Sequence, residues 1–427
     1  MSRVAVIGAG VMGMACALEL LKQGHAVAIF EADDRVGGMS AHFDFNGLSI
    51  ERYYHFICKP DTPYFELLEE LGLLHKLKWQ PTYMGYFFRG KLHDWGNPLA
   101  LLKFPGVSLL DRLRYGAHMF FASKRRRWQD LDRVEAGAWI RKWIGPRAYD
   151  VLWRPLFQLK FHQHSDDLSA AWIWTRIKRV GSSRRSLMQE ELGYLEGGSE
   201  SLLDAMETRI RALGGEIHLS TPVQRVNLEA GVVRGVTVRD ERREFDIVIS
   251  TAPLPFVPKL IPDLDEDTRR RYEAIDNIAV ACVIFKLARP VTRNFWLNVS
   301  DPDMDIPGII EYTNLRRMNE HIVYVPYYMP ADHEKYQWSN EQLIEEARGY
   351  LKRINPELAD ADFLDAFASR YRFAQPICPP GFLDRLPPIK TKVAGLYVAD
   401  TSYYYPEDRS ISESVRVGRE IAAMVEA

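Results

Sequence analysis

The sequence has few cysteines and no long apolar run. None of its four cysteines forms a CxxC pair; they are Cys16, Cys58, Cys282 and Cys378. This spacing argues against a disulfide framework and against a zinc site, and it favours a reducing compartment. No run reaches the roughly 18 apolar residues that a membrane-spanning helix needs. We therefore expect a cytoplasmic protein that at most rests on the inner face of a membrane.

Charge and composition exclude further classes of protein. The formal net charge of −2 provides no excess positive charge for nucleic acid, so we expect no nucleic-acid partner. With 47% apolar and 26% charged residues, the chain has the composition of a globular protein. A strand-like run begins at residue 3, so we expect no signal peptide. The length of 427 residues suits two domains.

The first thirty residues contain the fingerprint of a dinucleotide-binding unit. Residues 3–7 and 26–30 are apolar runs typical of buried parallel strands, and residues 15–21 between them have helical character. Three spaced glycines follow the first run and an acid ends the second; these residues are Gly8, Gly10, Gly13 and Glu31. The glycines permit a tight turn, close approach of a pyrophosphate and close helix–strand packing. The acid can accept hydrogen bonds from ribose hydroxyls, and the helix N-terminus attracts phosphate.

A second glycine loop follows the acid. Here Arg35 precedes the pair Gly37 and Gly38. The glycines allow the loop to approach a pyrophosphate from the other side, and the arginine adds positive charge there. A dinucleotide fingerprint alone does not separate nicotinamide from flavin cofactors, and this second loop favours a flavin.

The far end of the chain predicts the other half of the same site. Residues 395–400 form a further apolar run that ends on Asp400, which can hold the ribityl or pyrophosphate part of FAD. Ser410 and Glu413 fit a capping box at the start of a C-terminal helix. The helix N-terminus, at Ser412, can face the flavin N1–C2=O edge, where its dipole stabilises negative charge.

These motifs resemble the amine oxidase and protoporphyrinogen oxidase superfamily of flavoproteins, whose relatives include phytoene desaturases and UDP-galactopyranose mutases. Further landmarks occur in the expected order: a glycine pair at 197–198 before a helix over 199–213, and a strand that runs into Thr-Ala-Pro at 251–253. The segment 221–223 looks like the one whose valine backbone contacts the adenine, here Val223. The resemblance implies non-covalently bound FAD.

Three positions depart from the family pattern. The terminal strand runs directly from Ala399 to Asp400, without the glycine that relatives carry between them, so the local turn differs. Met39 and Ser40 follow the second glycine pair, where relatives often have Arg or Lys. The lysine that amine oxidases carry near flavin N5 aligns with Ala281, which disfavours an oxidase of simple amines.

The resemblance implies an α/β fold in which a Rossmann-like FAD-binding domain interleaves with an α+β substrate domain. A mixed sheet covered by helices would form the substrate domain. The expected FAD-binding segments are residues 1–56, 191–255 and 386–427, and the expected substrate-binding segments are residues 57–190 and 256–385. Within the substrate domain we expect a mainly helical segment before residue 190, strands at 278–287 and 321–328, and a helix at 335–355.

Two features outside the cofactor motifs allow more than one interpretation. Apolar residues recur at helical spacing within residues 99–128, and the basic run 124–127 follows them. Such a helix can rest on anionic lipid as a peripheral membrane contact, or it can pack normally with a solvated basic end. His162 and His164 alternate without a paired carboxylate, which is too little for a metal site, so we expect none.

The resemblance implies an oxidoreductase that passes a hydride from a bulky, apolar or lipid-linked substrate to flavin N5. Its partner would be this small-molecule or lipid-like substrate. His55, Tyr403 and Tyr404 are the candidate catalytic residues that could take an accompanying proton. One alternative is a mutase in which reduced flavin acts as a nucleophile on a nucleotide-sugar. Another is a binding protein that holds FAD structurally. The sequence carries no signal for the oligomeric state.

Overall fold

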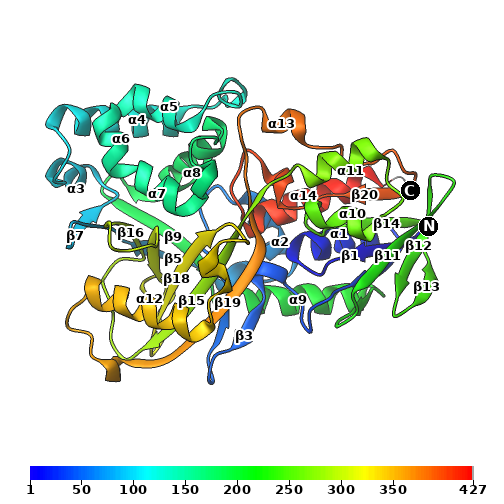
Figure 1. The fold of residues 1–427 in the computed structure, drawn as a ribbon. Coiled ribbons are helices and arrows are strands. Elements are labelled where there is room, and N and C mark those ends of the chain that lie inside the picture. Colours follow the sequence, from blue (N-terminus) through cyan, green and yellow to red (C-terminus); the bar gives the residue numbers. More distant parts are fainter. Residues whose placement is uncertain (426–427) are drawn as a thin grey trace.

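The computed structural model describes residues 1–425, and a five-stranded parallel sheet organises one half of it (Figure 1). Distant parts of the chain meet in this sheet. Strand β1 pairs with β2, which follows it closely, and also with β14, which lies more than two hundred residues later. The order is β10 (Glu216–His218), β2 (Ala26–Phe30), β1 (Arg3–Ile7), β14 (Ile247–Ser250) and β20 (Leu396–Val398). The apolar runs predicted as buried strands are therefore strands, and their side chains are almost all buried.

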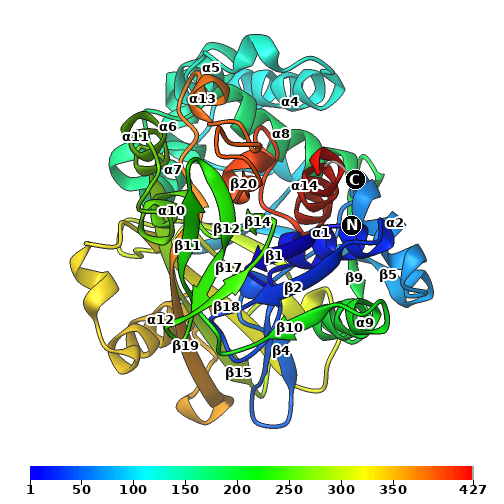
Figure 2. The ribbon, with the colours of Figure 1, turned by 90° about the vertical axis from the view of Figure 1, so that its right-hand side faces the viewer.

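Helices cover the parallel sheet and pack closely on one another. Helix α1 contacts both α9 and α14, and α14 contacts α2 (Figure 2). A Cβ at Gly418 would lie 2.5 Å from the Met12 carbonyl oxygen, so the glycine allows α14 to approach α1. The bounds are α1 (Val11–Lys22), α2 (Thr62–Glu70), α9 (Gly198–Ala212) and α14 (Ile411–Met424). An antiparallel meander lies beside them: β11 (Val223–Glu229), β12 (Val232–Val238) and β13 (Glu241–Glu244).

A seven-stranded mixed sheet forms the second half. The sheet is mixed because β16 runs parallel to β6, whereas β16 pairs antiparallel with β17 and β6 pairs antiparallel with β7. The order is β19 (Phe363–Pro376), β15 (Asn277–Leu287), β18 (His321–Met329), β17 (Gly308–Glu311), β16 (Trp296–Ser300), β6 (Met84–Phe88) and β7 (Lys91–Trp95). The strands predicted at 278–287 and 321–328 are confirmed as β15 and β18. The predicted α/β fold with a helix-covered mixed sheet is confirmed.

Helix α12 (Asn340–Ile354) packs against this sheet, and it is shorter than the predicted helix over 335–355. Ser339 begins the helix with a capping box, in which its hydroxyl accepts from the Gln342 amide and the Gln342 side chain accepts from the Ser339 amide. The chain before it forms a separate 3-10 turn, Glu334–Gln337. The capping serine therefore sets the boundary that hydropathy alone placed too early.

The segment 57–190 is less helical than expected. Besides α2 it holds six helices, gathered at the upper left of Figure 1: α3 (Pro98–Lys103), α4 (Leu109–Lys124), α5 (Ala136–Ile144), α6 (Pro146–Leu152), α7 (Arg154–Phe161) and α8 (Ala170–Ser182). It also contributes β6 and β7 to the mixed sheet, and β5 (Leu77–Thr82) and β8 (Arg184–Ser186) pair with β9 (Gln189–Leu195). The chain thus crosses repeatedly between the two halves, and the predicted domain boundaries stay a prediction.

Smaller elements complete the connections between the two halves. A short hairpin follows the second glycine loop. Two short helices lie between β14 and β15 in the sequence, and a third lies between β19 and β20. These elements are β3 (His42–Asp44), β4 (Ser49–Glu51), α10 (Val257–Leu260), α11 (Glu266–Glu273) and α13 (Phe382–Arg385). Within residues 1–425, no helix is long and apolar enough to cross a membrane.

Candidate functional site

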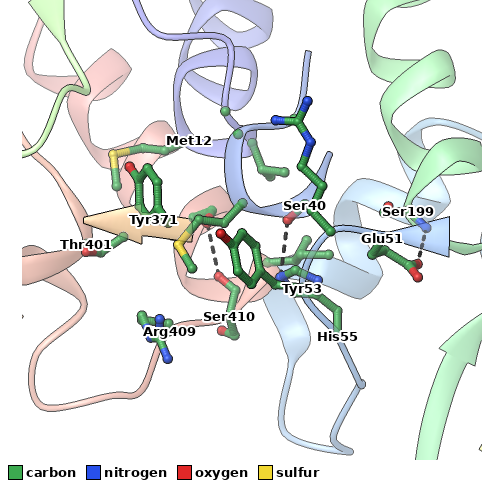
Figure 3. A pocket seen from close by; sticks show the side chains of 18 of the residues that line it. Met12, Ser40, Glu51, Tyr53, His55, Ser199, Tyr371, Thr401, Arg409 and Ser410 are labelled. Carbon is green, nitrogen blue, oxygen red and sulfur yellow. Dashed lines mark hydrogen bonds between the residues drawn. The ribbon is translucent and has the colours of Figure 1, made fainter. Parts of the chain in front are cut away.

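A cavity of about 760 Å³ is lined by both halves of the molecule. From the parallel sheet come the turn after β1, the loop after β2 and the segment before α14. From the mixed sheet come inward-facing residues of β15, β18 and β19. Figure 3 shows Ser40, Tyr371 and Ser410 from these segments around one space, together with Tyr53 from the loop after β4. Two distant ends of the sequence and its middle therefore meet at one site.

The turn after β1 can form only with glycine at two of its positions. Gly8 has φ +103°, and a Cβ there would lie 2.5 Å from the Thr251 hydroxyl. A Cβ at Gly13 would lie 2.1 Å from the Gly8 carbonyl oxygen, so α1 can pack against the turn only without a side chain there. Gly10 differs, because a Cβ there would meet no atom within 4 Å. It lines the cavity, so its missing side chain leaves space for a ligand rather than for the protein.

The second glycine loop lies directly against the first. Gly37 forms a parallel bridge with Gly10, and the Gly37 amide donates to the Ala9 carbonyl at 2.8 Å. Gly37 has φ +112° and Gly38 has φ +58°, so both occupy conformations that other residues rarely adopt. Both glycines line the cavity. The two loops together form the cradle that the spacing predicts.

Glu31 and Val223 lie where the sequence places them, at the edge of the cavity beyond the glycine turn. The Glu31 carboxylate accepts from the Ala9 amide at 2.7 Å and from the Asp33 amide at 2.9 Å. Each oxygen keeps a lone pair for a further donor, such as a ribose hydroxyl. The Thr221 amide donates to the Glu31 carbonyl at 2.7 Å, which holds the segment leading to Val223 against the same edge.

The position predicted for Arg35 is corrected by the structure. Its guanidinium donates to Asp34 at 2.7 Å and to the His42 carbonyl at 3.0 Å, and it does not line the cavity. A neighbouring acid and a free carbonyl compete successfully for this flexible side chain. Arg52 lines the cavity instead and is ion-paired with Asp33. Arg52 follows no glycine pair, so no cofactor motif pointed to it.

The C-terminal half of the site is built around Asp400. Its buried carboxylate accepts from the Leu254 amide and from the Ser402 amide, each at 2.8 Å. Burial raises the pKa of Asp400. The bond from Leu254 joins the end of β20 to the segment after β14, and the bond from Ser402 holds the turn that follows Asp400. Asp400 thus shapes the floor of the cavity that it also lines.

Helix α14 begins at this floor, with Ser412 in its first turn and lining the cavity. Ser410 caps the helix by accepting from the Glu413 amide at 3.1 Å. The predicted capping box is only half present, because the Glu413 carboxylate pairs with Arg416 at 2.6 Å instead of returning to Ser410. The N-terminus of α14 nevertheless opens toward the cavity, as the predicted dipole interaction requires.

His55 lines the cavity close to the second glycine loop (Figure 3). Its Nε2 lies 3.4 Å from the Ser40 hydroxyl, whereas its buried Nδ1 has no partner among residues 1–425. Burial lowers the pKa of His55, so the imidazole is neutral at neutral pH. A neutral imidazole with an unoccupied nitrogen can accept a proton.

The two predicted tyrosines are corrected in part. The Tyr403 hydroxyl donates to the Pro387 carbonyl at 2.7 Å, and Tyr403 does not line the cavity. Tyr404 does line it, but its hydroxyl lies 2.7 Å from Ser414, and burial raises the pKa of Tyr404. Both hydroxyls are therefore engaged in holding the segment before α14. The other tyrosines that line the cavity were not among the predicted site residues: Tyr53, Tyr54, Tyr64, Tyr194, Tyr312, Tyr328 and Tyr371.

Strand β15 presents no lysine to the cavity. Side chains alternate between the two faces of a strand, and Val280 and Cys282 are the β15 residues that line the cavity. Ala281, to which the family lysine aligns, belongs instead to the core cluster that includes α12 residues such as Leu343. Ala281 therefore faces away from the cavity, and neither of the β15 residues that line the cavity is a lysine.

The residues present fit FAD. The two glycine loops leave a side-chain-free cradle at Gly10 and Gly38, the N-terminus of α14 faces the same space, and a cavity of about 760 Å³ joins them. Gly8, Gly10, Gly13, Gly37 and Gly38 would hold the pyrophosphate, Glu31 and Val223 the adenosine, and Asp400 and Ser412 the flavin half. No group of metal-ligating side chains occurs within residues 1–425.

Comparisons with known proteins agree with this geometry. The model of the flavin containing amine oxidoreductase family matches residues 12–423. The 15-cis-phytoene desaturase of Synechococcus elongatus is 24% identical over 286 residues, covering 61% of this chain and 60% of that protein. The 4,4'-diapophytoene desaturase of Staphylococcus haemolyticus is 24% identical over 320 residues, covering 68% and 63%. The chain thus matches about three fifths of the length of these curated relatives.

Solved structures share the whole fold. A provisionally named protoporphyrinogen oxidase from Exiguobacterium sp. 255-15 superimposes with a TM-score of 0.78 at 18% identity, covering 99% of this chain and 98% of that one. Cyclohexylamine oxidase from Brevibacterium oxydans gives a TM-score of 0.72 at 16% identity, with coverage of 99% and 98%. The chain belongs to the flavin containing amine oxidoreductase family, which places it among the flavin-dependent oxidoreductases with FAD as cofactor.

Proposed function

We propose that the protein catalyses FAD-dependent oxidation of a bulky, apolar or lipid-linked molecule. One observation carries the proposal: the cavity runs without interruption from the glycine cradle to a wall of aromatic side chains on the mixed sheet. Bound FAD would supply a hydride acceptor at its N5 atom. The aromatic walls would orient the donor carbon and exclude water, and His55 Nδ1 would take an accompanying proton.

The composition of the walls supports a bulky substrate. Rings from three strands and one loop line the cavity, which gives flat apolar surfaces for a large ligand. They are Tyr53, Tyr54, Phe56, Trp296, Tyr328, Phe367, Tyr371 and Phe373. Relatives named for phytoene and diapophytoene suggest the same size class. Nothing in the comparisons favours a nucleotide-sugar mutase.

Anaerobic titration of the FAD-loaded protein with fractionated lipid and metabolite extracts tests the proposal. We expect at least one fraction to bleach the visible flavin bands, with an oxidised product that mass spectrometry detects as the loss of two hydrogens. If dithionite bleaches the flavin but no fraction of a complete extract does, the proposed oxidation is wrong.

We further propose that the protein contacts a membrane peripherally, on its cytoplasmic face, through the helices α3 and α4. Large apolar side chains on these helices are between 44% and 66% exposed, namely Leu99, Leu102, Leu109, Leu110, Leu113, Phe120 and Phe121. Lys124, Arg126 and Arg127 are exposed at the end of α4. An apolar helix face with a basic end suits an anionic lipid surface, from which a lipid-linked substrate could enter.

A further inference from the structure

Four cations gather at one end of the cavity. Lys160 on α7, Arg179 on α8 and Arg409 before α14 line the cavity. Arg176 on α8 is ion-paired with Asp408, which also lines it. None of these residues belongs to the glycine cradle, and no sequence motif predicted them. Their elements lie far apart in the chain, so only the fold brings them together.

The two arginines of α8 each have a carboxylate partner. Arg179 binds Asp61 through two hydrogen bonds, of 3.0 Å and 2.8 Å, and both side chains are nearly buried. Arg176 donates to Asp408 at 2.8 Å and to the Gln375 side chain at 3.1 Å. These two positive charges are therefore neutralised within the protein.

The other two cations have no carboxylate of their own. Lys160 Nζ lies 5.0 Å from the ring centre of Tyr328 and 5.7 Å from that of Phe161. Within residues 1–425 it makes neither a hydrogen bond nor an ion pair. Arg409 donates through Nη1 to the Ala374 carbonyl, while its buried Nε has no partner in the described chain. Both residues line the cavity.

The balance of charge around Asp408 makes this arrangement costly without a ligand. Arg176, Lys160 and Arg409 all act on this one carboxylate and lower the pKa of Asp408 against the effect of burial. Asp408 is already paired with Arg176, so Lys160 and Arg409 have only a share of this one carboxylate. Burial, followed by the neighbouring guanidinium of Arg176, lowers the pKa of Lys160 well below its usual value. A buried cation of this kind is stabilised by an anion that approaches it.

We propose that Lys160 and Arg409 bind an anionic group of the substrate, either a phosphate or a carboxylate. The proposal rests on the proposed function and deepens it, because the substrate is then an amphipathic anion whose apolar part lies along the aromatic walls. A protonated amine would be repelled at this end of the cavity. A neutral hydrocarbon would leave both charges without a counter-ion.

Equilibrium binding to the oxidised, FAD-loaded protein tests the proposal without turnover. The probes are decyl phosphate, decanoate and decanol below their micelle concentrations, and the readout is the perturbation of the flavin spectrum. We expect at least one anion to bind about tenfold more tightly than decanol or better. The stronger of the two anions then identifies phosphate or carboxylate as the group recognised. Equal affinity for all three probes would overturn the proposal.

Variants of Lys160 test whether the preference for an anion comes from the proposed site. Lys160→Met should remove most of the preference for the anion and leave the affinity for decanol unchanged, whereas Lys160→Arg should retain the preference. Lys142→Met removes an exposed lysine of α5 and is the matched control, with no change expected. If Lys160→Met shifts the flavin potential but not anion binding, the cluster serves the cofactor and the proposal fails. Because binding needs no reduction of the flavin, this outcome is separate from failure of the proposed oxidation.

If Lys160→Met does not fold, the salt dependence of anion binding to the natural protein tests the same proposal. Added salt should weaken the binding of the preferred anion and leave decanol unaffected. An anion affinity independent of salt would contradict charge recognition at this end of the cavity.

Discussion

At the scale of single residues, Gly10 and Gly13 separate the requirements of the fold from those of the cofactor. Gly10 has φ −66° and open space around its missing Cβ, so alanine fits the polypeptide there. Gly13 has no such space. We predict that Gly10→Ala leaves the apoprotein's thermal midpoint unchanged but weakens FAD binding by about tenfold or more, since the methyl group fills the cradle.

Fluorescence titration of apoprotein with FAD measures this effect. Gly349→Ala is the matched control, because Gly349 is an exposed residue of α12 whose Cβ would also meet nothing within 4 Å. This variant should bind FAD normally and gain slight stability. Normal FAD binding by Gly10→Ala would show that the first glycine loop does not face the pyrophosphate.

The unpaired nitrogen of His55 gives a second prediction at this scale. His55→Gln should slow flavin reduction by any substrate found by titration, by about 10²- to 10⁴-fold, because it removes the proton acceptor. The FAD content should stay unchanged, since the cradle is intact. Rapid-mixing kinetics provide the rate, and an unaltered rate would assign the proton to another group.

His118 gives a third prediction at this scale, which concerns the pH dependence of the free energy of unfolding. It is 1% exposed between Trp139 and Trp143, its two ring nitrogens have no partner among residues 1–425, and burial lowers the pKa of His118 from 6.5 to about 4. Below pH 6.5 the unfolded chain binds a proton that the folded protein refuses. The contribution of neutral His118 to the free energy of unfolding is therefore fully present above pH 6.5 and is lost as the pH falls toward 4.

The predicted contribution to this loss is about 3 kcal/mol. His118→Phe, which cannot take up a proton, should show a correspondingly shallower decline in the free energy of unfolding between pH 7 and pH 4. Denaturant unfolding at a series of pH values measures both proteins. Parallel curves for the two would mean that His118 is protonated in the folded state.

At the scale of elements, α4 is unusual in exposing apolar side chains along its length. Leu110 is 66% exposed and Phe121 is 57% exposed. We predict that the natural protein sediments with anionic vesicles and that the double variant Leu110→Glu/Phe121→Glu binds them at least about tenfold more weakly. Leu187→Glu is the control, because Leu187 is 74% exposed but lies between β8 and β9. Equal sedimentation of all three would remove α4 as the membrane contact.

Elements with a strong local signal were predictable from the sequence. The glycine turn after β1 was predictable because its backbone geometry excludes every other residue at Gly8 and Gly13. The buried strands β1, β2 and β15 were predictable because both of their faces are covered. Strands β6 and β7 were missed since they lie among helices in the sequence and join a sheet formed mainly by residues two hundred positions later.

At the scale of the whole molecule, the site depends on contacts that no local pattern encodes. Arg35 and Tyr403 were assigned by their neighbours in sequence, but each side chain found a nearer carboxylate or carbonyl partner. Lys160 and Arg409 meet across about 250 residues of chain, around one carboxylate. The cofactor half of the site consists of segments that each carry a local motif, so these segments could be predicted. The substrate half carries no such motifs and arises only from tertiary packing.

FAD binding is the central claim, and the visible spectrum of the protein purified without added cofactor tests it most directly. We predict a yellow protein with flavin absorption bands, which releases one FAD per chain on denaturation because no covalent bond holds it. The released cofactor can be identified by chromatography. A colourless protein that stays without flavin on titration with FAD would contradict the account of both glycine loops and of the C-terminal half of the site.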